Sequence, residues 1–180
     1  MTYSWDDILY HVEIMKIECP SIFKDIAERT IDITDLPARF SNITSIDGCA
    51  FCNCTNLALT SLPNSITTIG GSAFSDCKNL ALTSLPESLT KIGFNAFYRC
   101  TSLAITSLPA GITKIDSGAF SGCTNLTSIT FKGTPTTINS TAFDGCTNLT
   151  VVNVPWAEGA IAGAPWGATK ATINYNYTGE

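Results

Sequence analysis

The chain has 180 residues, of which 10 are Lys or Arg and 15 are Asp or Glu, so its formal net charge is −5. Hydrophobic residues make up 44% of the chain and charged residues only 14%, which excludes a highly charged disordered protein. Since no positive surplus exists to release counterions from phosphates, the composition also excludes a basic nucleic-acid-binding protein.

The N-terminal section is the acidic part of the chain and carries helix signals. Ser4 reads as a helix N-cap, and Pro20 ends the apolar pattern of helical spacing that follows it. Ser21 caps a second apolar stretch. We expect residues 1–30 to form a helical cap, with a helical hairpin that docks a partner as the alternative. The first residues lack a basic region followed by an apolar run, so they do not read as a signal peptide.

The middle of the chain repeats with a period of 23 residues. An Ala-Phe pair marks each period, a Cys follows each Phe by three residues, and a Leu follows that Cys by three. An Ile also precedes each Phe by five residues. The Phe column contains Phe51, Phe74, Phe97, Phe120 and Phe143. Five such periods without an insertion predict a stacked repeat architecture.

A unit of 23 residues cannot bury its own apolar face, so stacked coils must share one core. We expect residues 31–155 to form about five full coils after a degenerate first coil. Residues 57–62 and their copies should pair into a parallel sheet, and each Ala-Phe-x-x-Cys segment should make one helical or 3₁₀ turn opposite. The shared column of Asp47, Gly70, Gly93, Asp116 and Asn139 predicts a left-handed residue in each coil.

The pattern Ile-Gly-x-x-Ala-Phe-x-x-Cys-x-x-Leu at residues 69–80 resembles the BspA-type leucine-rich repeat. This resemblance implies an α/β fold: a right-handed, curved solenoid with its parallel sheet on the concave side. Family members are mostly adhesion and recognition proteins of cell surfaces or virions, in bacteria, some protozoa and phages. The resemblance therefore implies a cell-surface, secreted or virion-associated protein.

Residues 156–180 form a separate closing segment by sequence. They are similar to segments that follow such repeats in gut-bacterial and phage proteins. Residues 171–177 alternate polar and apolar side chains, which predicts a final edge strand. The chain has no run of 18 or more apolar residues, so we expect no membrane insertion.

The sequence offers little for catalysis or metal binding. The five cysteines that follow the Phe residues by three positions, which we call the Cys ladder, are best explained as buried thiols beside the Phe column. Cys49 and Cys52 should face outward while Cys54 points inward, so the three would not converge on a metal. The only histidine, His11, has no nucleophile in a suitable pattern. We expect a protein that is not an enzyme and needs no cofactor.

The concave face is the expected partner site. Strict column alignment places Thr60, Thr83 and Thr106 inward. An apolar stripe, formed by Leu59, Leu82 and Ile105, would then face outward beside hydroxyl groups. A one-residue slip would reverse this and turn the stripe inward. The expected site residues are Leu59, Ser61, Leu82, Ser84, Ile105, Ser107, Ser128 and Thr130.

Two functions remain open from the sequence. The first is a module that binds a protein or glycan surface through this face. The alternative is a structural component that associates with itself.

Overall fold

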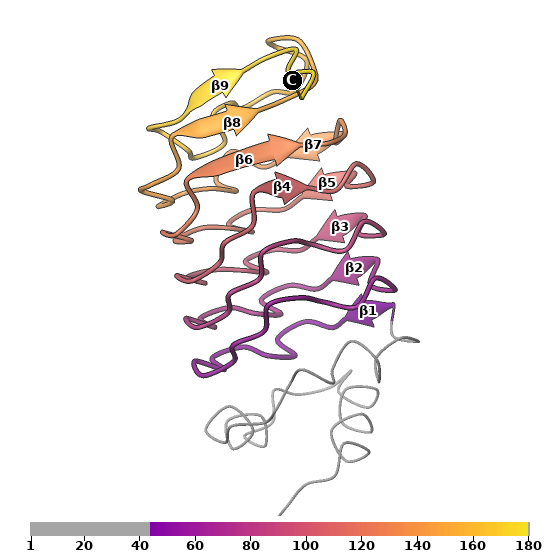
Figure 1. The fold of residues 1–180 in the computed structure, drawn as a ribbon, viewed down its shortest axis with the longest axis vertical. Coiled ribbons are helices and arrows are strands. Elements are labelled where there is room, and N and C mark those ends of the chain that lie inside the picture. Colours follow the sequence, from indigo (N-terminus) through magenta and orange to yellow (C-terminus); the bar gives the residue numbers. More distant parts are fainter. Residues whose placement is uncertain (1–43, 180) are drawn as a thin grey trace, which may run out of the picture.

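The computed structural model describes residues 44–179, which form an elongated solenoid of stacked coils (Figure 1). The expected helical cap over residues 1–30, the degenerate first coil before Ile43, and His11 lie outside the described residues.

Two parallel sheets run along the solenoid. The first has the order β1-β2-β3-β5-β7 and the second the order β4-β6-β8-β9 (Figure 1). The first comprises β1 (Ser45–Ile46), β2 (Thr68–Ile69), β3 (Lys91–Ile92), β5 (Lys114–Ile115) and β7 (Thr137–Ile138). The second comprises β4 (Ser107–Leu108), β6 (Ser128–Phe131), β8 (Val151–Asn153) and β9 (Thr172–Asn174).

Strand register confirms the repeat. Ile69 pairs with Ile92, and Leu108 pairs with Phe131, in each case 23 residues along the chain. The second sheet is the predicted one, but it begins only at β4. The segments 57–62 and 80–85, which were also predicted as strands, contain none. The first sheet was not predicted, since its strands are too short to show alternation.

The predicted core is confirmed. The side chains of Phe74, Phe97, Phe120 and Phe143 are fully buried, and so are most of the Ile, Ala, Cys and Leu columns. Successive Phe rings stack with centroids 5.2 to 5.4 Å apart and interplanar angles of 5° to 7°. One continuous apolar column therefore joins all five periods of the repeat.

The Ala-Phe-x-x-Cys segments form turns, and no helix is present within residues 44–179. Successive backbone N–H groups alternate between two kinds of partner. Ser75 N donates to Ser72 O in its own turn at 3.1 Å, whereas Phe74 N donates to Ala96 O of the next coil at 2.8 Å. Because every second N–H bonds to the neighbouring coil, a helical ladder of bonds within the segment cannot form.

The predicted left-handed column is wrong. Positive φ occurs instead two and six residues later, for example at Ser72 (φ 55) and Asp76 (φ 58). Gly70 serves a different purpose, because a Cβ there would lie 2.6 Å from the backbone N of Gly48. The glycine permits close approach of two coils rather than an unusual backbone conformation.

The ladder cysteines are buried thiols, as predicted. No disulfide joins Cys77, Cys100, Cys123 or Cys146. Each thiol donates to a Phe carbonyl of the preceding coil, for example Cys100 Sγ to Phe74 O at 3.0 Å. Burial raises the pKa of Cys100 to about 12 and that of Cys146 to about 12. Cys49 and Cys52 are partly exposed.

The C-terminal end of the core is closed by aromatic side chains. The ring centroids of Phe131 and Trp156 lie 5.2 Å apart at an interplanar angle of 76°, and Trp166 lies 6.2 Å from each of them. The predicted edge strand is confirmed as β9, which pairs with β8.

Replacing Phe97 should destabilise the protein strongly. We expect Phe97→Ala to lower the free energy of unfolding by about 3–5 kcal/mol, because it leaves a cavity in the Phe column. Phe94, in the same coil, is 55% exposed, and Phe94→Ala should change stability by less than about 0.5 kcal/mol. Chemical denaturation of both variants measures the difference. Equal losses would show that the Phe column is not the core.

The buried thiols predict a loss of stability at alkaline pH. The pKa of Cys100 is about 12 in the folded protein, above its ordinary value of 9.0. The unfolded chain therefore ionises first, so the free energy of unfolding should fall as pH rises from 9 to 12. Cys100→Ala should weaken this pH dependence in urea titrations. An unchanged slope in that variant would contradict the assignment.

Candidate functional site

The predicted orientation of the apolar stripe is wrong. Leu59, Leu82 and Ile105 are 5%, 0% and 2% exposed, so they belong to the core. The adjacent Thr60, Thr83 and Thr106 are exposed instead. The alternative register, with leucine inward and threonine outward, is the one the structure adopts.

The physical reason is the odd spacing between two inward positions. Leu80 and Leu85 both point into the core, but they are five residues apart, so strict alternation cannot serve both. Two consecutive residues must face outward at one place. In this coil the buried Leu82 puts that pair at Thr83-Ser84.

The fourth coil solves the same problem differently. There Ile129 is buried, so the pair of consecutive polar residues falls earlier, at Thr127-Ser128. Alternation is then regular from Ile129 to Phe131, which explains why β6 is the longest strand of its sheet. The location of the apolar residue, rather than column alignment, decides which side chains face outward.

The first three coils therefore present pairs of hydroxyl groups, which we call the hydroxyl face. These pairs are Thr60-Ser61, Thr83-Ser84 and Thr106-Ser107. None of the six hydroxyls makes a hydrogen bond to another residue within 44–179. Ser61 and Ser84 are exposed, whereas Ser107, Ser128 and Thr130 are half-buried.

Toward the C-terminus, the column of Ser61, Ser84 and Ser107 continues with side chains that hydrogen-bond to one another. Asn174 Nδ2 donates to Asn153 Oδ1 at 2.8 Å, and Asn153 Nδ2 donates to Thr130 Oγ1 at 3.0 Å. These side chains stabilise the sheet through one another. The hydroxyl groups of the earlier coils remain open to a ligand, which makes the N-terminal half of this face the stronger candidate site.

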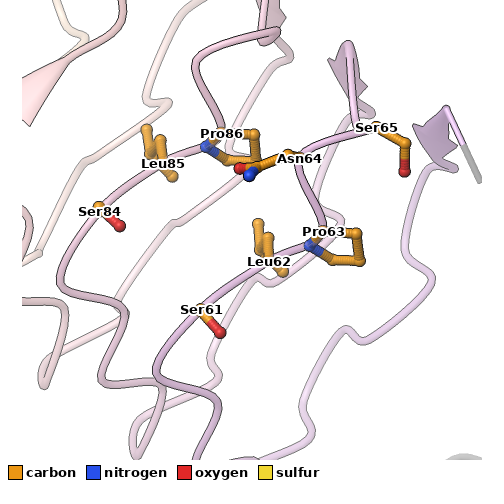
Figure 2. A pocket seen from close by; sticks show the side chains of 8 residues that line it. All are labelled: Ser61, Leu62, Pro63, Asn64, Ser65, Ser84, Leu85 and Pro86. Carbon is orange, nitrogen blue, oxygen red and sulfur yellow. The ribbon is translucent and has the colours of Figure 1, made fainter. Parts of the chain in front are cut away.

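A hollow adjoins the hydroxyl face between the first two coils (Figure 2). It is lined by residues 61–65 of one coil and 84–86 of the next, and its volume is about 500 Å³. Ser61 and Ser84 belong to both the hollow and the hydroxyl face. Pro63 and Pro86 contribute rigid apolar walls, and no charged residue is part of the lining. The hollow can therefore bind a ligand through neutral hydrogen bonds and through contacts with apolar surface.

An ion pair lies just beyond the hollow. Lys132 Nζ is 2.6 Å from Glu87 Oε1, two coils away in sequence. The ion pair bridges the intervening coil. In that coil the small side chain of Ala110 occupies the column position that Asn64 and Glu87 hold in the earlier coils. The two charges of this pair therefore offset one another beside the hollow.

Within residues 44–179, no group of three or more His, Cys, Asp or Glu side chains is arranged to hold a metal ion. In the same range no helix is long and apolar enough to cross a membrane.

Sequence reasoning missed part of this site. It identified Ser61 and Ser84 but assigned the threonines to the core, and it overlooked Asn64, Pro63 and Pro86. The repeated Thr-Ser-Leu-Pro motif was the available signal, since two hydroxyl residues before a Leu-Pro pair recur in three coils.

Comparison with known proteins identifies the repeat. The BspA type leucine rich repeat region matches residues 28–150 in six copies. Among curated proteins, none matches the chain significantly.

Two crystal structures are similar to this chain. A leucine rich cell surface protein from Faecalibacterium prausnitzii is 31% identical with a TM-score of 0.57, and the match covers 66% of this chain and 31% of that one. A leucine rich repeat protein from T. pallidum is 27% identical with a TM-score of 0.56, and the match covers 75% of this chain and 64% of that one. The chain thus spans less than two thirds of either relative.

The register of the face can be tested by stability. Leu82→Ala should lower the free energy of unfolding by about 2–5 kcal/mol, because the side chain is fully buried. Thr83→Ala should change it by less than about 0.5 kcal/mol, because the threonine is exposed. Thermal and urea unfolding measure both. A larger loss of stability for Thr83→Ala than for Leu82→Ala would instead support the register in which the leucine faces outward.

Proposed function

Because the chain belongs to the BspA-type leucine-rich-repeat family, we propose that it is a non-enzymatic recognition module of a surface-associated or secreted protein. Its hydroxyl face and the adjoining hollow bind a protein or glycan partner. The observation that carries the proposal is the row of hydroxyl pairs without internal hydrogen-bond partners, next to a hollow of about 500 Å³.

The chemistry of the face supports recognition over catalysis. Hydroxyl groups donate and accept hydrogen bonds but are weak nucleophiles unless a base lies within hydrogen-bond reach. The described chain contains no His, and the lining of the hollow contains no acid or base. Neutral donors and acceptors beside proline rings suit a partner held by many weak contacts.

The relatives support the location. The relative from Faecalibacterium prausnitzii is described as a cell surface protein. Parallel-sheet solenoids also provide extended surfaces on which adjacent coils contribute equivalent side chains. The partner-contacting residues we assign are Ser61, Ser84, Ser107 and Ser128, joined by the threonines of the hydroxyl face. Thr130 is left out because its hydroxyl already accepts a hydrogen bond from Asn153.

Self-association is the second candidate, and strand β9 favours it. β9 lies at the end of its sheet and pairs only with β8 within the described residues. An edge strand has unpaired backbone groups that can pair with another chain. Concentration-dependent mass in sedimentation would support this candidate, and a constant monomer mass would oppose it.

A charge placed on the hydroxyl face should weaken partner binding. The full chain is first screened against a panel of extracellular-matrix proteins and neutral glycans. For a binder so found, Thr83→Asp should weaken binding by at least about tenfold, because it introduces a charge that must be desolvated at the contact.

Thr137→Asp is the matched control, because Thr137 is an exposed threonine of β7, in the other sheet. It should leave the affinity unchanged in surface plasmon resonance. Equal effects of the two substitutions, or none from either, would contradict binding through the hydroxyl face.

A further inference from the structure

The coil that follows β3 differs from the other coils on its outer surface. Phe94 shares its column with Gly48, Gly71, Ser117 and Ser140. Tyr98 shares its column with Cys52, Ser75, Ser121 and Asp144, and Arg99 shares its column with Asn53, Asp76, Gly122 and Gly145. Because the coils stack in one register, these columns act as internal controls. They show that the fold needs no large side chain at any of the three positions.

Of these three side chains, those of Phe94 and Arg99 are exposed and that of Tyr98 is half-buried. Phe94 is 55% exposed, and no other large hydrophobic side chain within residues 44–179 is similarly exposed. The Arg99 guanidinium carbon lies 5.0 Å from the ring centroid of Tyr98. Stacking on the ring orients the planar guanidinium while its N–H edges remain available to a ligand.

The backbone conformation of Arg99 is unfavourable for a long side chain. Its φ is +54°, a left-handed value that disfavours residues with a side chain. The next two coils place Gly122 and Gly145 at this position, with φ of 74° and 70°. Arginine thus occupies a left-handed position that holds asparagine or aspartate in the first two coils and glycine in the two coils that follow.

Within residues 44–179, neither Lys91 nor Arg99 forms an ion pair. In the next coil, Lys114 Nζ lies 2.7 Å from Asp116 Oδ1. The equivalent pair in this coil is Lys91 and Gly93, so the carboxylate is missing.

Arg99 makes no ion pair within residues 44–179, although Asp76 shares its column one coil earlier. Its stem lies toward the next coil instead, because a Cβ on Gly122 would come within 3.1 Å of Arg99 Cγ.

We propose that Lys91, Phe94, Tyr98 and Arg99, the aromatic–basic patch, form a second binding site that takes a carboxylate-bearing sugar. The guanidinium of Arg99 pairs with the carboxylate, with Lys91 adding attraction. The C–H groups of a pyranose face carry slight positive charge and pack on the negative face of an aromatic ring, here Phe94. Ser121, in the column of Tyr98 in the next coil, supplies a hydroxyl for the sugar, whereas the Ser117 hydroxyl is already hydrogen-bonded to that of Thr141 at 2.8 Å.

The features of the patch favour a sugar over an acidic peptide. A peptide is usually anchored by a strand edge or by pockets for its side chains. β3 is paired on both sides, and the hollow is lined by none of the four patch residues. An exposed aromatic ring and an oriented guanidinium on the same coil suit a single acidic sugar unit.

The repeat itself provides substitutions that the fold accepts. Phe94→Ser, Tyr98→Ser and Arg99→Gly each copy the residue found at the same column of the next coil. Lys78→Thr is the matched control, since it removes an exposed cation outside the patch and copies Thr101 of the next coil. Thermal unfolding midpoints close to that of the parent chain confirm that each variant is folded.

The test is calorimetric or NMR titration of the full chain with two pairs of probes. One pair is sialyllactose and lactose, and the other is trigalacturonate and its methyl ester. At least one acidic sugar should bind about tenfold more tightly than its uncharged counterpart. Arg99→Gly should remove that difference, Phe94→Ser should weaken binding further, and Lys78→Thr should change neither.

Three results would overturn the proposal. These are no binding of either acidic sugar, equal affinity for charged and uncharged probes, or an equal loss in Lys78→Thr. Tri-glutamate is the fifth probe, and binding as tight as that of the sugars would indicate an acidic peptide site instead. Thr83→Asp on the hydroxyl face should leave sugar binding intact, so the two sites are tested separately.

Discussion

Each coil of this solenoid can place its backbone only where the next coil accepts its hydrogen bonds. Every second N–H of the turn segments bonds to the following coil, and the Phe rings stack at 5.2 to 5.4 Å along the same direction. A coil with one residue more or fewer would misalign both. The 23-residue period is therefore a packing requirement, and functional variation is confined to side chains that point away from the stack.

Within that constraint, an odd spacing creates the candidate site. Leu80 and Leu85 both need to enter the core, and the five-residue interval forces two neighbours outward together. In three coils those neighbours are threonine and serine. The hydroxyl face is thus a consequence of core packing, and the binding role that we propose for it requires no departure from the repeat. The aromatic–basic patch is the opposite case, since it departs from the repeat at Phe94, Tyr98 and Arg99 in a single coil.

Much of the fold follows from the sequence, because buried columns repeat without interruption. The Phe, Cys and Leu ladders, the parallel pairing and the final strand were all predictable. The orientation of Leu59, Leu82 and Ile105 was not, because column alignment assumes that every coil breaks its alternation at the same place. The first sheet could not be predicted because strands of two residues carry no periodic signal. The hollow could not be predicted because its shape depends on how the turns of two coils pack together.

The central claim is that apolar residues, not column alignment, decide which side chains of each coil face outward. Cysteine accessibility tests it most directly. In native protein, the new thiol of Thr83→Cys should react with a maleimide about as fast as an exposed model thiol, because position 83 is exposed. The new thiol of Leu82→Cys should react far more slowly, because position 82 is fully buried. Faster labelling at position 82 than at position 83 would contradict the account.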